Sequence, residues 1–187
     1  MTNNDTRPTK LLWVDLEMTG LDSTNDLILE IAAVVTDFEF KELARYESRV
    51  KYDAETVQER MKLNEWWNNF PDNRDDFIQK LDQGKELGTV EEELLTFVGH
   101  EFGEETAILA GNSIHQDRKF IARWWPNLDK KLHYRMFDVT SLKIYMRGKY
   151  GIEYEKQQVH RALGDIQESM SEWQYYFTWL REHNGDA

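Results

Sequence analysis

Apolar runs separated by polar breaks dominate the first third of the chain. Residues 10–15 read Lys-Leu-Leu-Trp-Val-Asp, residues 27–38 are apolar and β-branched, and residues 43–52 alternate between apolar and polar side chains. Runs of this length and composition predict three β-strands. We expect residues 37–41 to form a tight connection between the second and third runs, which gives a meander of three antiparallel strands.

The middle of the chain changes to helical spacing. Residues 53–61 and 75–81 favour two short helices, and residues 89–92, Thr-Val-Glu-Glu, have the pattern of a capping box that opens a longer helix. That helix would bury four apolar residues at helical spacing, namely Val90, Leu94, Val98 and Phe102.

Two further strands and a long final helix complete the pattern. Residues 107–112 and 136–139 favour strands, each followed by a helix, and apolar residues recur every three or four positions from Ala162 to Leu180. This order predicts an α/β fold with a mixed five-stranded sheet, three antiparallel strands plus two parallel ones, flanked by helices.

Length and composition indicate one domain. We expect the 187 residues to form a single domain over 1–187, with residues 1–9 as a disordered tail. The chain has no cysteine, which excludes disulfides and thiolate metal sites and fits a reducing cytoplasm. The N-terminus is polar through Lys10, and no apolar run reaches the roughly 20 residues of a membrane helix. We therefore expect a cytoplasmic location.

Charge is distributed unevenly along the chain. The net charge is −12, yet residues 118–149 carry nine basic and two acidic residues, and residues 72–105 carry eleven acidic and three basic ones. Tracking a long phosphate backbone requires an extended basic surface. An acidic protein with one basic patch therefore favours a short substrate held at its end, although both segments also suit ordinary solvated faces.

Asp15 and Glu17 are the first candidate functional residues. They lie at the end of the first predicted strand, before the break at Thr19 and Gly20. Side chains two positions apart on a strand point to the same face, so the two carboxylates project together. Taken alone, such a pair also fits two exposed charges at a strand terminus.

Three further candidates follow later in the chain. Asp117 comes after the turn signal at residues 111–113 and lies at or near a helix start, where it would also suit the helix dipole. His160 and Asp165 are five residues apart, a rotation of about 140° on a helix. We therefore place His160 in the preceding loop or a frayed first turn and Asp165 inside the final helix.

Four carboxylates gathered at one point would repel one another strongly unless cations lay between them. Oxygen ligands with open positions suit Mg²⁺ or Mn²⁺, and pairs of such ions drive phosphodiester cleavage. The combination is more specific than any of its members.

At this point the chain resembles a known family. Asp15-Leu16-Glu17, Asp117 within residues 112–117, and His160 followed after four residues by Asp165 look like the three signatures of the DEDDh group of 3′→5′ exonucleases. Within that group the chain resembles the oligoribonucleases, through residues 13–22, 30–32, 111–113, 133–135, 138–139 and 165–169. The resemblance implies a ribonuclease-H-like fold and degradation of short oligoribonucleotides, down to dinucleotides, to nucleoside 5′-monophosphates.

The resemblance also implies a set of chemical roles. Two divalent cations, Mg²⁺ or Mn²⁺, would be bridged by Asp15, with Glu17 and Asp165 completing one site and Asp117 holding the second ion through water. His160 would be the general base that takes a proton from the attacking water, a role that its ordinary pKa near ~6.5 allows.

Substrate contacts are implied by the same resemblance. Leu21 matches an apolar wedge between the last bases, and Trp66 matches an aromatic residue that stacks on a base, although its neighbour Trp67 makes that assignment ambiguous. Ser113 and Gln116 match polar positions near the substrate. Leu21 and Trp66 also fit ordinary core positions.

Tyr134 and Arg135 match residues that reach the active site of a neighbouring subunit. There they would close around the 5′-phosphate, and the planar guanidinium of arginine suits bidentate contact with phosphate oxygens. The partners implied are therefore short single-stranded RNA and a second copy of the chain, as a homodimer. The alternative for this pair is an exposed surface edge.

The chain departs from the oligoribonuclease pattern at residues 67–74, at His115, where glycine is usual, and at Gly164, where a second aspartate is usual. None of these departures removes a predicted metal ligand or the base. They bear on substrate length preference.

Rival functions use parts of the same pattern. A glycoside hydrolase also employs paired carboxylates, and the seven tryptophans of this chain would stack on sugars. An inactive protein of the same fold would bind oligonucleotides without cleaving them. A DEDDh exonuclease acting on longer RNA 3′ ends or on single-stranded DNA is the nearest alternative.

Overall fold

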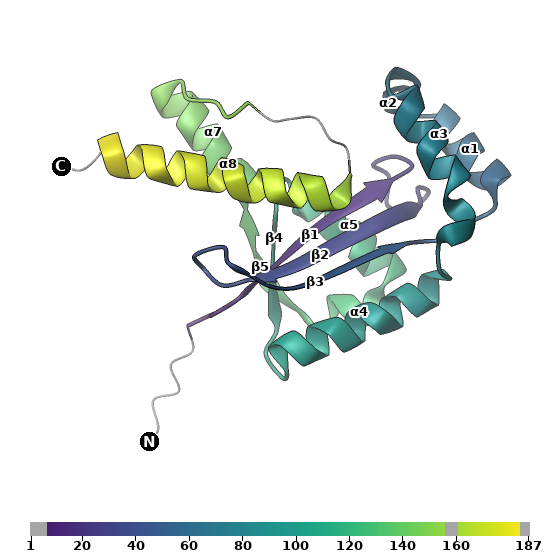
Figure 1. Cartoon of the computed structure of the whole chain (residues 1–187), viewed down its shortest axis with the longest axis horizontal. Coiled ribbons are helices and arrows are strands. Elements are labelled where there is room, and N and C mark those ends of the chain that lie inside the picture. The colour runs from purple at the N-terminus through teal and green to yellow at the C-terminus, as the bar shows by residue number, and fades with distance from the viewer. Residues whose placement is uncertain (1–6, 156–160, 184–187) are drawn as a thin grey trace.

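The computed structural model describes residues 7–155 and 161–183. Its five strands form one sheet in the order β3-β2-β1-β4-β5 (Figure 1). Their bounds are β1 Leu11–Met18, β2 Ile28–Thr36, β3 Glu42–Arg49, β4 Ala107–Gly111 and β5 Leu132–Asp138. β1, β2 and β3 are antiparallel, whereas β4 lies parallel to β1 and β5 parallel to β4. The predicted mixed sheet is confirmed.

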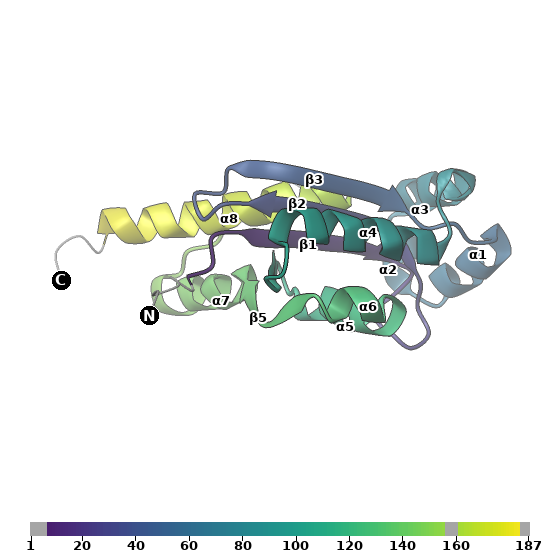
Figure 2. The same ribbon diagram turned by 90° about the horizontal axis from the view of Figure 1, so that it is seen from below.

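Helices surround this sheet on both faces and at one end. The helices are α1 Ala54–Lys62, α2 Glu65–Asn69, α3 Pro71–Gln79, a 3-10 turn at Leu81–Gln83, α4 Leu87–Phe102, α5 His115–Trp124, α6 Pro126–Asp129, α7 Val139–Tyr150 and α8 Ala162–His183. Helices α8 and α4 flank the sheet on opposite sides, and α1, α2 and α3 gather beyond one end of the antiparallel strands (Figures 1 and 2).

Strand β1 divides the core because its side chains alternate between the two faces. Leu12, Val14 and Leu16 pack in the cluster that includes buried residues of α4, α5 and α6. Leu11 and Trp13 pack in a second cluster with buried residues of α7 and α8. The odd-numbered positions of β1 therefore face the side of the sheet that α8 covers.

A third apolar cluster holds α1, α2 and α3 against the end of β2. Leu29 of β2 is buried with Val57 and Met61 of α1 and with Phe77 of α3. Trp67 of α2 is 1% exposed and belongs to the same cluster. These three helices are thus fixed beside the point where β1 ends.

Several predicted element bounds were wrong. β1 continues to Met18, β5 begins at Leu132 rather than 136, and α3 begins at Pro71 rather than 75. A proline at the first helical position is favourable, which explains the earlier start of α3.

The capping box predicted at residues 89–92 is also wrong. Helix α4 already begins at Leu87, without a side-chain cap, so these residues lie inside it. The carboxylate of Glu91 instead accepts hydrogen bonds from the backbone N–H groups of Asn127, at 2.7 Å, and Leu128, at 3.3 Å, which ties α4 to α6. The predicted core positions Val90, Leu94 and Val98 are buried, as expected, whereas the fourth, Phe102, is only partly buried against the same cluster.

Within the residues described, no helix combines the length and the apolar character needed to cross a membrane. The predicted single domain stays a prediction. Of the predicted tail, residues 1–6 lie outside the part of the chain that the structure describes, and residues 7–9 have no regular secondary structure.

Candidate active site

The site begins with the alternation of β1. Asp15 and Glu17 continue the odd-numbered face that Leu11 and Trp13 bury beneath α7 and α8. Both carboxylates therefore project toward α8 from the last part of the strand. The prediction that they share a face is confirmed.

Asp165 comes to the same place from the first turn of α8. Its backbone N–H donates to the carbonyl oxygen of Arg161 at 2.9 Å, which closes the first turn of the helix. One carboxylate oxygen each from Asp15, Glu17 and Asp165 lie within 4.8 Å of one another. All three side chains are partly buried. Residues as far as 150 positions apart in sequence thus form one acidic cluster.

Asp117 approaches β1 from the first turn of α5. The last register pair between β1 and β4 is Trp13 with Ala110, so within the described part of the chain no strand pairs with β1 on that side beyond this point. The Asp117 side chain, 6% exposed, accepts a hydrogen bond from the backbone N–H of Leu16 at 3.0 Å. Asp117 thus lies against the backbone that connects Asp15 to Glu17.

The cluster has an electrostatic cost. The pKa of Glu17 is raised from its ordinary value to about 8, chiefly by burial and then by the charges of Asp165 and Glu30. The positive charge of Arg161 lowers this pKa and the charge of Asp117 raises it further. Among the groups named here, those that disfavour the charged form of Glu17 therefore outweigh the favourable charge of Arg161.

The pKa of Asp117 is raised to about 7, and burial is the largest cause. The hydrogen bond from Leu16 opposes this shift, and the charge of Asp138 adds to it. Carboxylate oxygens that converge at one point are the ligand type that hard divalent ions prefer. The residues present therefore fit a divalent metal centre.

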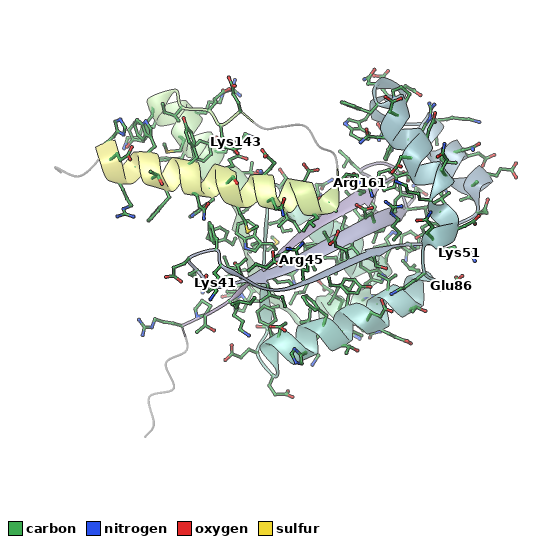
Figure 3. All side chains as sticks on the ribbon, in the orientation of Figure 1. Lys41, Arg45, Lys51, Glu86, Lys143 and Arg161 are labelled. Carbon is green, nitrogen blue, oxygen red and sulfur yellow. The ribbon has the colours of Figure 1, made fainter. Side chains whose placement is uncertain are left out.

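The predicted general base, His160, lies outside the described residues. Its neighbour Arg161 is held firmly. The Arg161 guanidinium donates to Glu30 at 2.8 Å and to Asp76 at 2.6 Å, and it lies 5.0 Å from the centre of the Phe77 ring. Arg161 thus joins the start of α8 to β2 and α3, as its position in Figure 3 illustrates.

Glu30 is a residue of the site that the sequence analysis did not single out. It is 9% exposed and lies directly opposite Glu17 in the β1–β2 register. Its carboxylate accepts from Arg49 at 3.1 Å as well as from Arg161. Glu30 lies in one of the stretches that carried the family resemblance, but its pairing with Glu17 depends on strand register.

An open groove lies beside the loop that follows β1. Leu21, which is 66% exposed, lines it together with Leu63, Arg60 and Asn64. The loop after β1 is closed by Thr19, whose hydroxyl donates to Asp26 at 2.8 Å. The exposure of Leu21 rules out the alternative of a core residue.

Trp66 and Trp67 are clearly distinguished by their surroundings. Trp67 is buried and donates its indole N–H to the carbonyl oxygen of Thr19 at 3.0 Å, so it supports the loop that carries Leu21. Trp66 is partly exposed and packs its ring against Trp67 and Phe70. Of the two, Trp66 is therefore the one accessible to a ligand.

Ser113 lies between β4 and α5, and Gln116 lies in the first turn of α5. Ser113 has φ 51°, a left-handed conformation that is strained for a serine, and its backbone N–H donates to Asp138 at 3.0 Å and to Thr140 at 2.8 Å. The Gln116 side-chain amide donates to the carbonyl oxygen of Leu21 at 3.4 Å. Gln116 is thus adjacent to the groove.

Tyr134 and Arg135 lie apart from these groups in the sheet, on the edge strand β5. Both side chains are exposed, and the Arg135 guanidinium lies 5.1 Å from the centre of the Tyr134 ring. The basic group is therefore presented at the outer edge of the sheet, where it is accessible to another molecule.

Residues 12–173 match the family model described as Exonuclease, a span that includes all four carboxylates. The chain belongs to this exonuclease family. Membership in this family identifies the chain as a hydrolase of the nuclease class. The acidic cluster of Asp15, Glu17 and Asp165 is consistent with the divalent cations that such enzymes use.

Relatives within the exonuclease family are oligoribonucleases. The chain is 38% identical over 170 residues to an oligoribonuclease of Francisella tularensis subsp. tularensis, covering 89% of this chain and 93% of the relative. It is 37% identical over 180 residues to an oligoribonuclease of Thiobacillus denitrificans, covering 94% and 95%. The resemblance inferred from the motifs is confirmed.

Solved structures support the fold. An exonuclease I from Methylocaldum szegediense superposes with a TM-score of 0.61 at 16% identity, covering 96% of this chain and 42% of that chain. E. coli exonuclease I, crystallised with a 5cy-dA13 oligonucleotide, gives a TM-score of 0.60 at 13% identity, covering 94% and 43%. The chain thus spans less than half of these larger proteins, and the similarity establishes a shared ribonuclease-H-like fold.

Proposed function

We propose that this protein is a 3′→5′ exoribonuclease that degrades short oligoribonucleotides, down to dinucleotides, to nucleoside 5′-monophosphates. The observation that carries the proposal is the convergence of Asp15, Glu17 and Asp165, with Asp117 bonded to the strand between the first two. The proposal draws further support from the near-full-length similarity to oligoribonucleases. A cytoplasmic location is part of the proposal, which the cysteine-free composition favours.

Two divalent cations, Mg²⁺ or Mn²⁺, are the proposed cofactors. Asp15 would be shared by both ions, Glu17 and Asp165 would complete the site of one ion, and Asp117 would hold the second through water. When bound, such ions stabilise the attacking and leaving oxygens of an in-line displacement at phosphorus. The raised pKa of Glu17 supports this assignment, because a bound cation would favour the charged form that burial disfavours.

The protein residues would perform three tasks in the reaction. His160 would accept the proton of the attacking water, as the family resemblance implies. Leu21 would pack against the terminal bases, and Trp66 would stack on one of them. Ser113 and Gln116 would contact the substrate end, a role that fits the position of Gln116 beside Leu21.

We also propose that the active unit is a homodimer. Tyr134 and Arg135 would reach the neighbouring copy and contact the 5′-phosphate of its substrate. The exposure of both side chains on the edge strand β5 supports this role. A site that closes around the 5′-phosphate would limit the substrate to a short strand, in agreement with the acidic overall charge.

The decisive experiment is digestion of a 5′-labelled RNA ladder, from two to seven nucleotides, with Mn²⁺ or Mg²⁺ and with chelator. We expect metal-dependent shortening from the 3′ end, with the dinucleotide cut at least as fast as the seven-mer. A strong preference for the seven-mer or for single-stranded DNA would replace the proposal with the alternative exonuclease. Cleavage that survives the chelator would refute the metal mechanism.

A further inference from the structure

Helix α8 carries a polar stripe on its buried side. Asp165, Ser169, Glu172 and Tyr176 are spaced by four, three and four residues, which places them within about 40° of one direction around the helix. Ser169, Glu172 and Tyr176 are 3%, 0% and 0% exposed. The cluster ligand Asp165 is therefore the outermost member of a line of otherwise buried polar groups.

Glu172 is the centre of this stripe and has no place in the chemistry proposed above. Its Oε2 accepts from the side-chain amide of Asn112 at 2.8 Å, and its Oε1 accepts from the Tyr176 hydroxyl at 3.1 Å. The ammonium of Lys143, on α7, lies 3.2 Å from Oε1, and Figure 3 shows this side chain between α7 and α8. A fully buried carboxylate is costly without such partners, so Glu172 depends on the correct placement of Asn112, Tyr176 and Lys143.

Asn112 extends the same network to the end of β4. It directly follows Gly111, the last residue of β4, and its Oδ1 accepts from the Thr140 hydroxyl at 3.0 Å. Its amide also reaches the Ser169 hydroxyl at 3.4 Å, and that hydroxyl donates to the carbonyl oxygen of Asp165 at 2.8 Å. Hydrogen bonds thus run from β4 through Asn112 to the turn of α8 that carries Asp165.

The hydrogen bonds of α8 add to its apolar contacts in fixing its placement. Crossing angles between packed helices scatter by about 15–20° from one protein to another, so the general class of packing does not set one exact angle. Hydrogen bonds are directional, and they weaken steeply when the donor–acceptor distance grows by about an ångström or when the donor–hydrogen–acceptor angle becomes strongly bent. Glu172 lies about 10 Å along the helix from Asp165, so a rotation at Glu172 moves Asp165 as well.

We propose that Glu172 is a positioning residue, which fixes the rotation and axial position of α8 against β4 so that Asp165 reaches Asp15 and Glu17. It acts through Asn112 on one side and through the rigid helix on the other. The inference rests on the proposed metal-dependent function. It adds to that function a residue that holds Asp165, one of the proposed metal ligands, in position.

The test is Mn²⁺ binding to the full chain, measured by calorimetry, for the wild type and for Glu172→Gln. This variant keeps the shape of the side chain but presents an amide to the Asn112 and Lys143 donors. We expect Mn²⁺ affinity to fall about 10–100-fold, as for other residues that support metal ligands. The kcat on RNA should fall in parallel, with little change in KM.

The matched control is Val98→Ala, a buried change in α4 on the opposite face of the sheet. It should lower the melting temperature while leaving Mn²⁺ affinity unchanged. A Glu172→Gln protein that loses stability like this control but binds Mn²⁺ within twofold of the wild type would overturn the positioning role.

Tyr176→Phe is the milder variant if Glu172→Gln does not fold. It removes one donor to Glu172, and we expect a smaller loss of Mn²⁺ affinity in the same direction, while unchanged affinity would contradict the proposal. Failure of the wild type to bind Mn²⁺ or cleave RNA would instead refute the proposed function. The two failures are therefore distinguishable.

Discussion

The carboxylate of Asp117 accepts the backbone N–H of Leu16 at 3.0 Å, a contact that joins positions 101 residues apart. The hydrogen bond takes the place of strand pairing where β4 no longer accompanies β1. It also holds the fourth carboxylate against the strand that presents Asp15 and Glu17. One local contact therefore satisfies a buried backbone group and completes the acidic site.

Replacing Asp15 with asparagine should abolish cleavage. Asp15→Asn keeps the size of the side chain and removes the charge at the centre of the cluster, so we expect the rate to fall by at least about a thousandfold. The circular dichroism spectrum should match that of the wild type. Asp75→Asn, an exposed change on α3, is the control and should retain full activity. Residual activity of Asp15→Asn near the wild-type level would remove Asp15 from the metal site.

Stability without divalent cations should decrease as pH rises from about 5 to about 8. The pKa of Glu17 is raised to about 8 and that of Asp117 to about 7, so the folded state binds more protons than the unfolded state in this range. Each group contributes a slope of up to about 1.4 kcal/mol per pH unit between its unfolded and folded pKa values. Thermal unfolding in chelator, at several pH values, measures the effect.

Added Mn²⁺ should flatten this pH dependence, because a cation favours the charged carboxylates. Glu17→Gln in chelator should flatten it too, since the group with the largest shift is gone. A melting temperature that rises between pH 5 and 8 without metal would contradict the electrostatic picture of the site.

Removing the apolar side chain of Leu21 should weaken substrate binding. For Leu21→Ala we expect KM for a dinucleotide to rise about tenfold, the equivalent of about 1.4 kcal/mol of lost contact with a base. Leu43→Ala is the control, because Leu43 is also an exposed leucine but lies on the edge strand β3. Equal kinetics of the two variants would show that Leu21 does not touch the substrate.

A mixing experiment tests the proposed role of Arg135 in the partner's site. Arg135→Ala should lose about 10–100-fold in kcat/KM on 5′-phosphorylated substrates, because a charge-assisted contact to phosphate is lost. Asp15→Asn is inactive for a different reason. In a mixed dimer, the subunit with intact Asp15 receives Arg135 from the other, so activity should exceed that of either variant alone. Absence of such recovery, in a mixture shown to exchange subunits, would place Arg135 outside the shared site.

Much of the site could be predicted from sequence, because the strand that carries Asp15 and Glu17 and the helix that carries Asp165 are recognisable from the periodicity of consecutive residues. Strand alternation placed Asp15 and Glu17 on one face, and helical spacing placed Asp165 inside α8. Motif order then joined these residues to Asp117 through family resemblance. Each inference used neighbouring residues or a known pattern. The structure brings Asp15, Glu17 and Asp165 together and bonds Asp117 to the strand between the first two.

Other features depend on contacts between distant segments. Which of Trp66 and Trp67 is accessible follows from the packing of α2 on α1 and α3, and the failed capping box follows from the contact of Glu91 with α6. The pairing of Glu30 with Glu17 follows from strand register. The spacing of residues along the chain is the same whichever tryptophan is buried, whichever residue caps the helix and whichever strand register forms. Spacing alone therefore does not predict these outcomes.

The sequence by itself therefore determined the order of the strands and helices and the identities of the acidic residues, because periodicity is a property of consecutive positions. Tertiary structure alone decided that α8 covers the odd-numbered face of β1 and that Glu172 is buried against Asn112. The physical reason is that the rotation of a helix and the register of a strand minimise the free energy of the whole packed domain, not of any segment within it.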